Sequence, residues 1–116
     1  MEIKKYESNG RFSKVVRRGG VLYISGLVPG DVTADVKGQT AQILKNVEET
    51  LLQYGSDKEH LLSVVMYVKD MSLLKDMNSV YDEWVPKGNE PARVCAALMV
   101  ASEKVLVEVS CTAAIK

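Results

Sequence analysis

Two charged residues, Arg93 and Glu108, stand out because each lies in a stretch that otherwise contains apolar or small residues. Residues 92–99 and 104–115 both have the composition and alternation of β-strands. A charge that loses its water is costly unless it is paired or used. The two side chains are therefore either a structural ion pair or part of a site.

The alternation in these stretches predicts which way the two charges point. The odd positions of residues 105–115 are all apolar, and so are the even positions of residues 92–98. Because side chains alternate between the faces of a strand, both apolar sets are expected to face a helical layer. Arg93 and Glu108 then emerge together on the helix-free face. The small and apolar residues on that face predict contact with another subunit, which would shelter the charged pair.

Hydrophobic spacing predicts two helices. Residues 36–54 have apolar residues at helical intervals, with Asp35 as N-cap and Gly55 as the glycine that follows the helix. A second helix is expected from a cap at Asp70 or Ser72 to residue 85, because Pro86 restricts the residue before it.

The remaining segments predict strands. Gly19-Gly20 suits a two-residue turn between strands at residues 12–18 and 21–26. A short strand is expected at residues 2–6, a strand buried on both faces at residues 60–69, and a final hairpin at residues 92–99 and 104–115. This order predicts an α+β fold of one domain, residues 1–116, in which two helices pack on one face of a mixed β-sheet.

The composition of the chain argues against several classes of function. The formal net charge is zero, with no basic stripe, which argues against a nucleic-acid partner. No run approaches the length of a membrane span, and the N-terminus has no apolar signal core. Cys95 and Cys111 are expected to be reduced thiols in a cytoplasmic protein. A single histidine, His60, and no Cys-x-x-Cys motif make a metal site unexpected.

Several motifs together resemble the reactive intermediate deaminase family, also called Rid or YjgF. They are P-A-R-V-C at 91–95, V-E-V at 107–109, V-K-D at 68–70 followed by M-N-x-V-Y-D-E-W at 77–84, and L-Y-I-S-G at 22–26. The resemblance covers nearly the whole chain. It implies a homotrimer with a chorismate-mutase-like barrel, helices outside and clefts between subunits.

The resemblance also implies an activity. Family enzymes hydrolyse 2-imino acids and their enamine tautomers to 2-keto acids and ammonia, without a cofactor. By position, Arg93 would bind the substrate carboxylate with its planar guanidinium. Glu108 would transfer the proton. Cys95 would line the cleft, Ser25 would lie near the opposite wall, and Phe12 would form part of that wall.

The sequence departs from the best-known deaminase branch at three places. Phe12 replaces a tyrosine, Leu27 replaces a glutamine, and Ala101-Ser102 replaces a Leu-Pro pair in the last connection. These departures predict a divergent branch with a different substrate preference.

Other interpretations remain open at this point. Arg93 and Glu108 would form an interface salt bridge if they had no ligand. If Glu108 contributed only to the shape of the site or to pairing, the chain would be a non-catalytic trimeric binder of small carboxylates. An RNA-directed role is disfavoured by the zero net charge. A nucleophilic role for Cys95 lacks a base at suitable spacing, and His60 is expected to start a strand.

Overall fold

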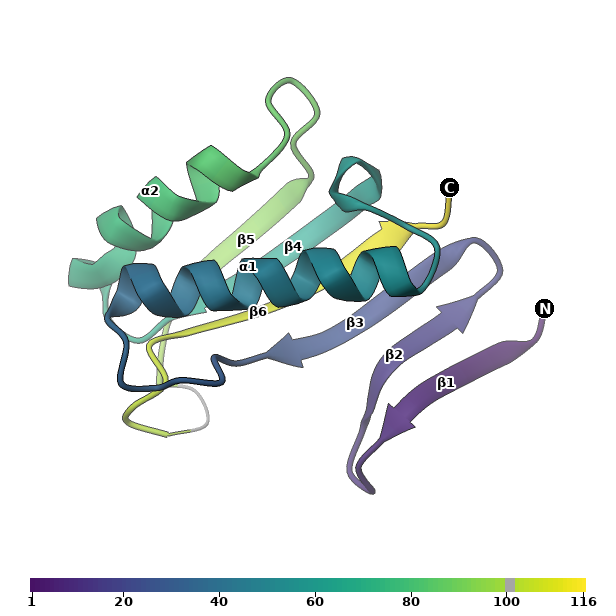
Figure 1. The fold of residues 1–116 in the computed structure, drawn as a ribbon, viewed down its shortest axis with the longest axis horizontal. Coiled ribbons are helices and arrows are strands. Elements are labelled where there is room, and N and C mark those ends of the chain that lie inside the picture. Colours follow the sequence, from purple (N-terminus) through teal and green to yellow (C-terminus); the bar gives the residue numbers. More distant parts are fainter. Residues whose placement is uncertain (100–101) are drawn as a thin grey trace.

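The computed structural model describes residues 1–99 and 102–116. In this part of the chain, one six-stranded mixed sheet carries two α-helices on the same face (Figure 1). The strands run in the order β1-β2-β3-β6-β4-β5 across the sheet. Their bounds are β1 Ile3–Ser8, β2 Ser13–Arg18, β3 Val21–Leu27, β4 Leu61–Val68, β5 Ala92–Ala97 and β6 Val107–Ala114. The predicted fold class, a mixed sheet with two helices on one face, is confirmed.

Helix α1 (Val36–Gln53) ends within one residue of its predicted boundary. The carboxylate of Asp35 accepts a hydrogen bond of 2.8 Å from the amide of Gly38, which satisfies an amide of the first turn. Gly55 follows the helix with φ +87°, a conformation that favours glycine. The buried face of α1 packs on the sheet through Thr40, Ile43, Leu44, Val47 and Leu51.

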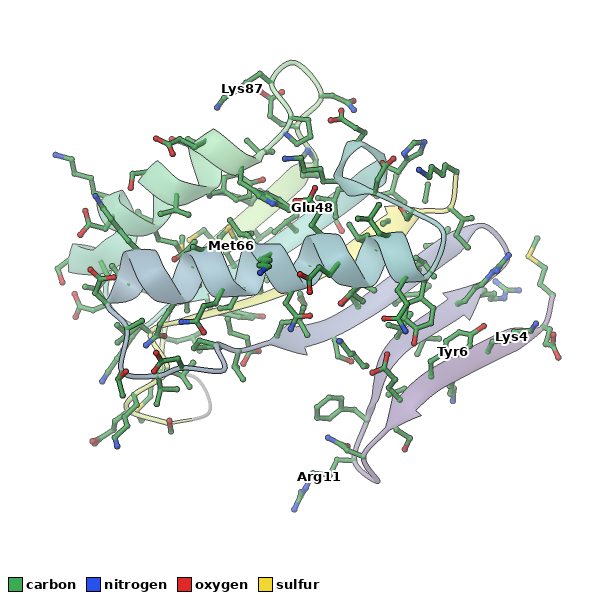
Figure 2. All side chains as sticks on the ribbon, viewed as in Figure 1. Lys4, Tyr6, Arg11, Glu48, Met66 and Lys87 are labelled. Atoms are coloured by element: carbon green, nitrogen blue, oxygen red, sulfur yellow. The ribbon has the colours of Figure 1, made fainter. Side chains whose placement is uncertain are left out.

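Helix α2 (Leu74–Trp84) begins later than predicted, because a 3₁₀ turn, η2 (Met71–Leu73), precedes it. Asp70 caps that turn and accepts a hydrogen bond of 2.8 Å from the amide of Ser72. The helix connects β4 to β5, which are parallel, so β4, α2 and β5 form a crossover unit. The two helices are joined by a hydrogen bond from the indole of Trp84 to Glu48 of α1, whose position Figure 2 labels.

The prediction that β5 and β6 form a hairpin is wrong. Strand β4 lies between them, antiparallel to β6 and parallel to β5. The two strands are close in sequence, but α2 carries the chain over the sheet so that β5 pairs with the strand that precedes the helix. The departure at Ala101-Ser102 falls in the intervening connection, and Ala101 lies outside the described residues.

The predicted direction of Arg93 is also wrong. Val64 of β4 pairs with Cys111 on one side and with Arg93 on the other, and paired residues point to the same face. Val64 and Cys111 are buried under the helices, so Arg93 lies on the helix-covered face. Glu108 pairs with Tyr67 and lies on the opposite face. The apolar even positions of β5, which were expected beneath the helices, face the uncovered side instead.

The core lies between the sheet and the helices. Met66, at the centre of the covered face, is fully buried (Figure 2). The helix-free face, the side of the sheet opposite α1 and α2, is only half-buried at Val65, Tyr67 and Ser110, and Val94 on it is 61% exposed. Strand β4 was expected to be buried on both faces, but a chain only 20 Å thick has a single layer of helices and leaves one face open.

The β1–β2 hairpin extends beyond the region that the helices cover (Figure 1). A two-residue turn at Gly19-Gly20 joins β2 to β3, as predicted, and Gly19 has φ +58°. His60 belongs to a 3₁₀ turn, η1 (Lys58–His60), immediately before β4 rather than to the strand. Neither of the described helices is long and apolar enough to cross a membrane.

Candidate functional site

Glu108 lies in an open pocket with a volume of about 430 Å³. The pocket is lined by Phe12, Ser25, Gly26, Val28 and Glu108. Its volume is within the range of small-molecule sites. Glu108 itself is half-buried, and its carboxylate forms no ion pair with any residue that the structure describes. The pocket therefore combines one ionisable group with largely apolar walls.

A bulge in β3 brings the chain close to Glu108. Ile24 pairs with Cys111, whereas Leu27 pairs with Val109, so β3 has one extra residue in this interval. Gly26 lies within the bulge, and a Cβ built on it would be 2.9 Å from Cδ of Glu108. The carboxylate thus occupies the space that a side chain at position 26 would need. A larger residue here would push the flexible end of the Glu108 side chain aside, so glycine at this position sets where the carboxylate lies.

Ser25 and Phe12 form other parts of the pocket wall. The hydroxyl of Ser25 donates a hydrogen bond of 2.6 Å to the carbonyl of Ser13, which ties β3 to β2. Phe12 is 52% exposed. Its amide donates to Oδ1 of Asn9 at 3.1 Å, and its carbonyl accepts from the amide of Asn9 at 3.1 Å. These bonds fix the backbone of Phe12 at the tip of the β1–β2 hairpin.

Arg93 is held by two residues of α2. Its Nη1 donates a hydrogen bond of 2.8 Å to Oδ1 of Asn78, and its Cζ lies 4.8 Å from the centre of the Tyr81 ring. Burial raises the pKa of Tyr81, and the nearby arginine opposes that rise. Nη1 also contacts Sδ of Met66 at 3.6 Å, and the side chain of Arg93 is exposed, so it has further guanidinium donors for a ligand. This geometry suits the binding of a planar anion such as a carboxylate.

The two cysteines differ in environment. Cys95 is half-buried and lies two residues after Arg93 on the same face of β5. Cys111 is buried beneath the helices, and burial raises the pKa of its thiol to about 12. Cys111 is therefore not a source of thiolate near neutral pH.

The structure brings three of the five predicted site residues together. Phe12, Ser25 and Glu108 share the pocket, whereas Arg93 and Cys95 lie on the other face of the sheet with β4 between. An ion pair between Arg93 and Glu108 within one chain is excluded by this arrangement. The two groups meet only if they belong to different subunits.

Sequence reasoning gave too little weight to three residues around these groups. Asn78 and Tyr81, which belong to the motif at 77–84, were not predicted as site residues, and both contact Arg93. Their spacing of three residues places them on one helix face, which is a usable signal. Val28 also lines the pocket, and nothing in its local sequence indicates a site.

Within the described residues, no cluster of three or more histidine, cysteine or acidic side chains is arranged to hold a metal ion. His60 is bound instead to Asp57, with 2.6 Å between Nδ1 and Oδ1, on a different part of the molecule. The pocket and the Arg93 cluster thus consist of acid, guanidinium, amide, hydroxyl and apolar groups.

Comparison with known proteins identifies the family. The family model described as Endoribonuclease L-PSP matches residues 2–115. This chain belongs to that family. A RutC family protein of Haemophilus ducreyi is 34% identical over 113 residues, covering 97% of each chain. The RutC family protein YoaB of Escherichia coli is 31% identical over 115 residues, covering 99% of this chain and 100% of YoaB.

Solved structures agree with this assignment. NMB1025 of Neisseria meningitidis, described as a member of the YjgF protein family, superposes with a TM-score of 0.96 at 35% identity. The match covers 100% of this chain and 97% of NMB1025. The resemblance to the Rid/YjgF family that the sequence motifs indicated is therefore confirmed over residues 2–115.

Proposed function

We propose that this protein hydrolyses reactive 2-imino acids, and their enamine tautomers, to 2-keto acids and ammonia. Membership of the Rid/YjgF family supports this class of reaction. The observation that carries the proposal is the Glu108 carboxylate in an open pocket, packed against a glycine and without an ion-pair partner in the described part of the chain. A carboxylate in that environment is available to accept and return a proton.

The site is composite. Arg93 and Glu108 lie on opposite faces of one sheet, so the two groups act together only when Arg93 comes from a neighbouring subunit. The open, partly apolar helix-free face, which includes Glu108 and Val94, supports association with further copies of the chain. A ring with cyclic symmetry repeats the same contact at each interface, and a homotrimer would then have a cleft at each of its three interfaces.

Arg93 has the role of holding the substrate. Its guanidinium forms two parallel hydrogen bonds to the carboxylate of the imino acid, while Asn78 and Tyr81 keep it in position. Cys95, on the same face of β5, lines this side of the cleft. Phe12 and Ser25 line the other side, next to Glu108.

Glu108 has the role of moving the proton. It accepts a proton from water as the water oxygen bonds to C2 of the protonated imine, which gives a carbinolamine. It then returns that proton to the amine nitrogen. As the C–N bond breaks, the carbinolamine hydroxyl gives its proton to Glu108, the C2–O bond becomes a carbonyl, and ammonia leaves and takes this proton from Glu108 as ammonium. Water supplies the oxygen of the keto acid, and no redox step occurs. Because imines also hydrolyse in water unaided, positioning and one proton-transfer group suffice for a useful acceleration.

The first test measures this reaction directly. Generating 2-iminopropanoate and 2-iminobutanoate in situ and following keto-acid release should show acceleration by the wild type, and loss of that acceleration in Glu108→Gln and Arg93→Ala. Glu108→Gln is expected to retain binding of the keto-acid product, whereas Arg93→Ala is expected to lose it. If the wild type releases keto acid no faster than buffer alone, the proposal is refuted for these substrates.

The second test examines whether the site is shared. Arg93→Ala and Glu108→Gln are each expected to be inactive alone, but refolding them together should restore activity. In a closed ring with random mixing, about one quarter of the clefts receive an intact Arg93 and an intact Glu108. No recovery of activity in mixed oligomers would refute a cleft that combines Arg93 of one subunit with Glu108 of another.

The same variants separate an enzyme from a carboxylate binder. In a non-catalytic trimer, Arg93 would still bind the ligand, and Glu108→Gln would change neither binding nor any turnover. Unchanged binding together with no difference in keto-acid release between wild type and Glu108→Gln would favour the binder.

A further inference from the structure

The walls of the Glu108 pocket are unusually apolar for a site that handles a polar reaction. Phe12 is 52% exposed and Val28 is 41% exposed, and both line the pocket beside the carboxylate. Exposed apolar groups that surround a small cavity are typical of ligand sites. Gly26 contributes no side chain, so the bulk of the wall comes from these two residues.

The pocket has no free side-chain hydrogen-bond donor among the residues that line it. Ser25 donates its hydroxyl hydrogen to the carbonyl of Ser13 at 2.6 Å. Glu108 has the proton-transfer role in the proposed function and, when ionised, only accepts hydrogen bonds. None of the other lining residues, Phe12, Gly26 and Val28, has a side-chain donor. A substrate side chain that only accepts hydrogen bonds, such as a carboxylate, would lose water here and gain no side-chain donor in return.

Hydrogen bonds hold the backbone of Phe12, which carries part of the apolar wall. Two hydrogen bonds of 3.1 Å join the backbone of Phe12 to Asn9, so the ring is presented from a closed turn. Figure 2 labels the adjacent Arg11 at this hairpin tip, where its side chain extends away from the rest of the molecule. The nearest cation in sequence is thus not directed into the pocket.

We infer that the pocket selects 2-imino acids with branched or aromatic apolar side chains, and that Phe12 and Val28 determine this preference. The inference rests on the proposed function, because it places the substrate carboxylate on Arg93 of a neighbouring subunit and C2 near Glu108. The side chain of the substrate then lies against Phe12 and Val28. An acidic side chain is rejected because it would face Glu108 without a compensating donor.

The experiment compares three imino acids generated in situ by an amino-acid oxidase from leucine, alanine and glutamate. The wild type should show kcat/KM for the isobutyl substrate about 10- to 100-fold above that for the methyl substrate. A closed apolar pocket discriminates by about tenfold or more per methylene, and an open pocket discriminates less. The substrate with an acidic side chain should be the slowest. Phe12→Ala and Val28→Ala should each reduce the preference, mainly through KM for the isobutyl substrate.

A matched control comes from the outer surface of α1. Leu52 is 56% exposed, close to the value for Phe12, but belongs to a helix that does not line the pocket. Leu52→Ala should therefore leave the preference unchanged. Equal rates for the three substrates, or a preference that survives in Phe12→Ala and Val28→Ala, would overturn the inference while leaving the deaminase proposal intact.

Binding of the products gives a readout that does not need turnover. Calorimetry with 4-methyl-2-oxopentanoate and 2-oxopropanoate should show tighter binding of the branched acid by wild type and a smaller difference in Phe12→Ala. If no imino acid is turned over but this difference in binding is present, the deaminase proposal fails and the selectivity of the pocket stands. If the two keto acids bind equally, the selectivity fails whatever the activity.

Discussion

Oδ1 of Asn78 accepts a hydrogen bond of 2.8 Å from the guanidinium of Arg93. The same guanidinium lies over the ring of Tyr81, one helical turn further along α2. An arginine held from two sides has lost much of its rotamer freedom before a ligand arrives, which lowers the entropic cost of binding. Asn78 is therefore a positioning residue for Arg93, and it acts through the arginine rather than on the substrate.

Removing this support should weaken substrate binding without changing the chemical step. Asn78→Ala should raise KM for 2-iminopropanoate about tenfold, which corresponds to about 1.5 kcal/mol for a hydrogen bond to a charged group, and should leave kcat nearly unchanged. Ser79→Ala is the control, because the only partner of the Ser79 hydroxyl among the described residues is the carbonyl of Asp76 in its own helix. A fall in kcat with KM unchanged would contradict the positioning role.

Gly26 gives a second test, because its missing side chain makes room for Glu108. In Gly26→Ala the new methyl group would displace the carboxylate, which lies at the end of a flexible side chain and moves more readily than the backbone. We expect turnover to fall at least about tenfold while the free energy of unfolding changes by no more than about 1–3 kcal/mol. Steady-state kinetics and urea unfolding measure the two effects separately.

The matched control for this substitution is Gly30→Ala. A Cβ at position 30 would meet no atom within 4 Å, so this variant adds the same methyl group in open space. It should keep wild-type turnover. Equal activity in both variants would show that the position of the Glu108 carboxylate is not critical.

The helices and the class of fold were predictable because their signals are local. The cap at Asp35, the helical spacing of Ile43 and Val47, and the glycine after the helix all act within a few residues. The alternation in β6 was equally informative about which side chains are buried, because one face of this strand lies under the helices of the same chain. That alternation correctly predicted that Glu108 lies on the helix-free face.

The direction of Arg93 could not be read in the same way. Alternation shows which set of residues avoids water, but it does not show whether a helix of the same chain or a neighbouring subunit covers them. In β5 the apolar set, which includes Val94, faces the open side of the sheet, and Arg93 faces α2. Pairing between β4 and β5 is also non-local, because α2 separates the two strands in sequence.

This open face leads to a prediction about assembly. Val94 is 61% exposed in the single chain and lies beside Val65 on the helix-free face. If that face is covered by other subunits, Val94→Glu would bury a charge in the interface and should convert the oligomer to monomer, as measured by light scattering. Leu52→Glu, on the exposed face of α1, should leave the mass unchanged. A Val94→Glu protein with the mass of the wild type would place the interface elsewhere.

Asp57 links the end of the chain to the turn before β4, and this contact should depend on pH. Its carboxylate lies 2.6 Å from Nδ1 of His60 and 3.3 Å from Nζ of Lys116. The hydrogen bond with His60, aided by Lys116, lowers the pKa of Asp57 in the folded protein. Folding therefore favours the ionised form, so the contribution to stability is complete above the unfolded pKa, about 3.8, and is lost as the pH falls through the folded value.

Asp57→Asn should accordingly destabilise the protein at pH 5 and above, and the difference from wild type should shrink as the pH falls below about 3.8. Urea unfolding at a series of pH values between about 5 and 2 measures this difference, because each midpoint gives a free energy of unfolding. Asp82→Asn, on α2, removes a carboxylate that has no ion-pair partner among the described residues, and its effect should not follow the same profile. A penalty for Asp57→Asn that stays constant down to pH 2 would mean that the side chain acts through packing and not through its charge.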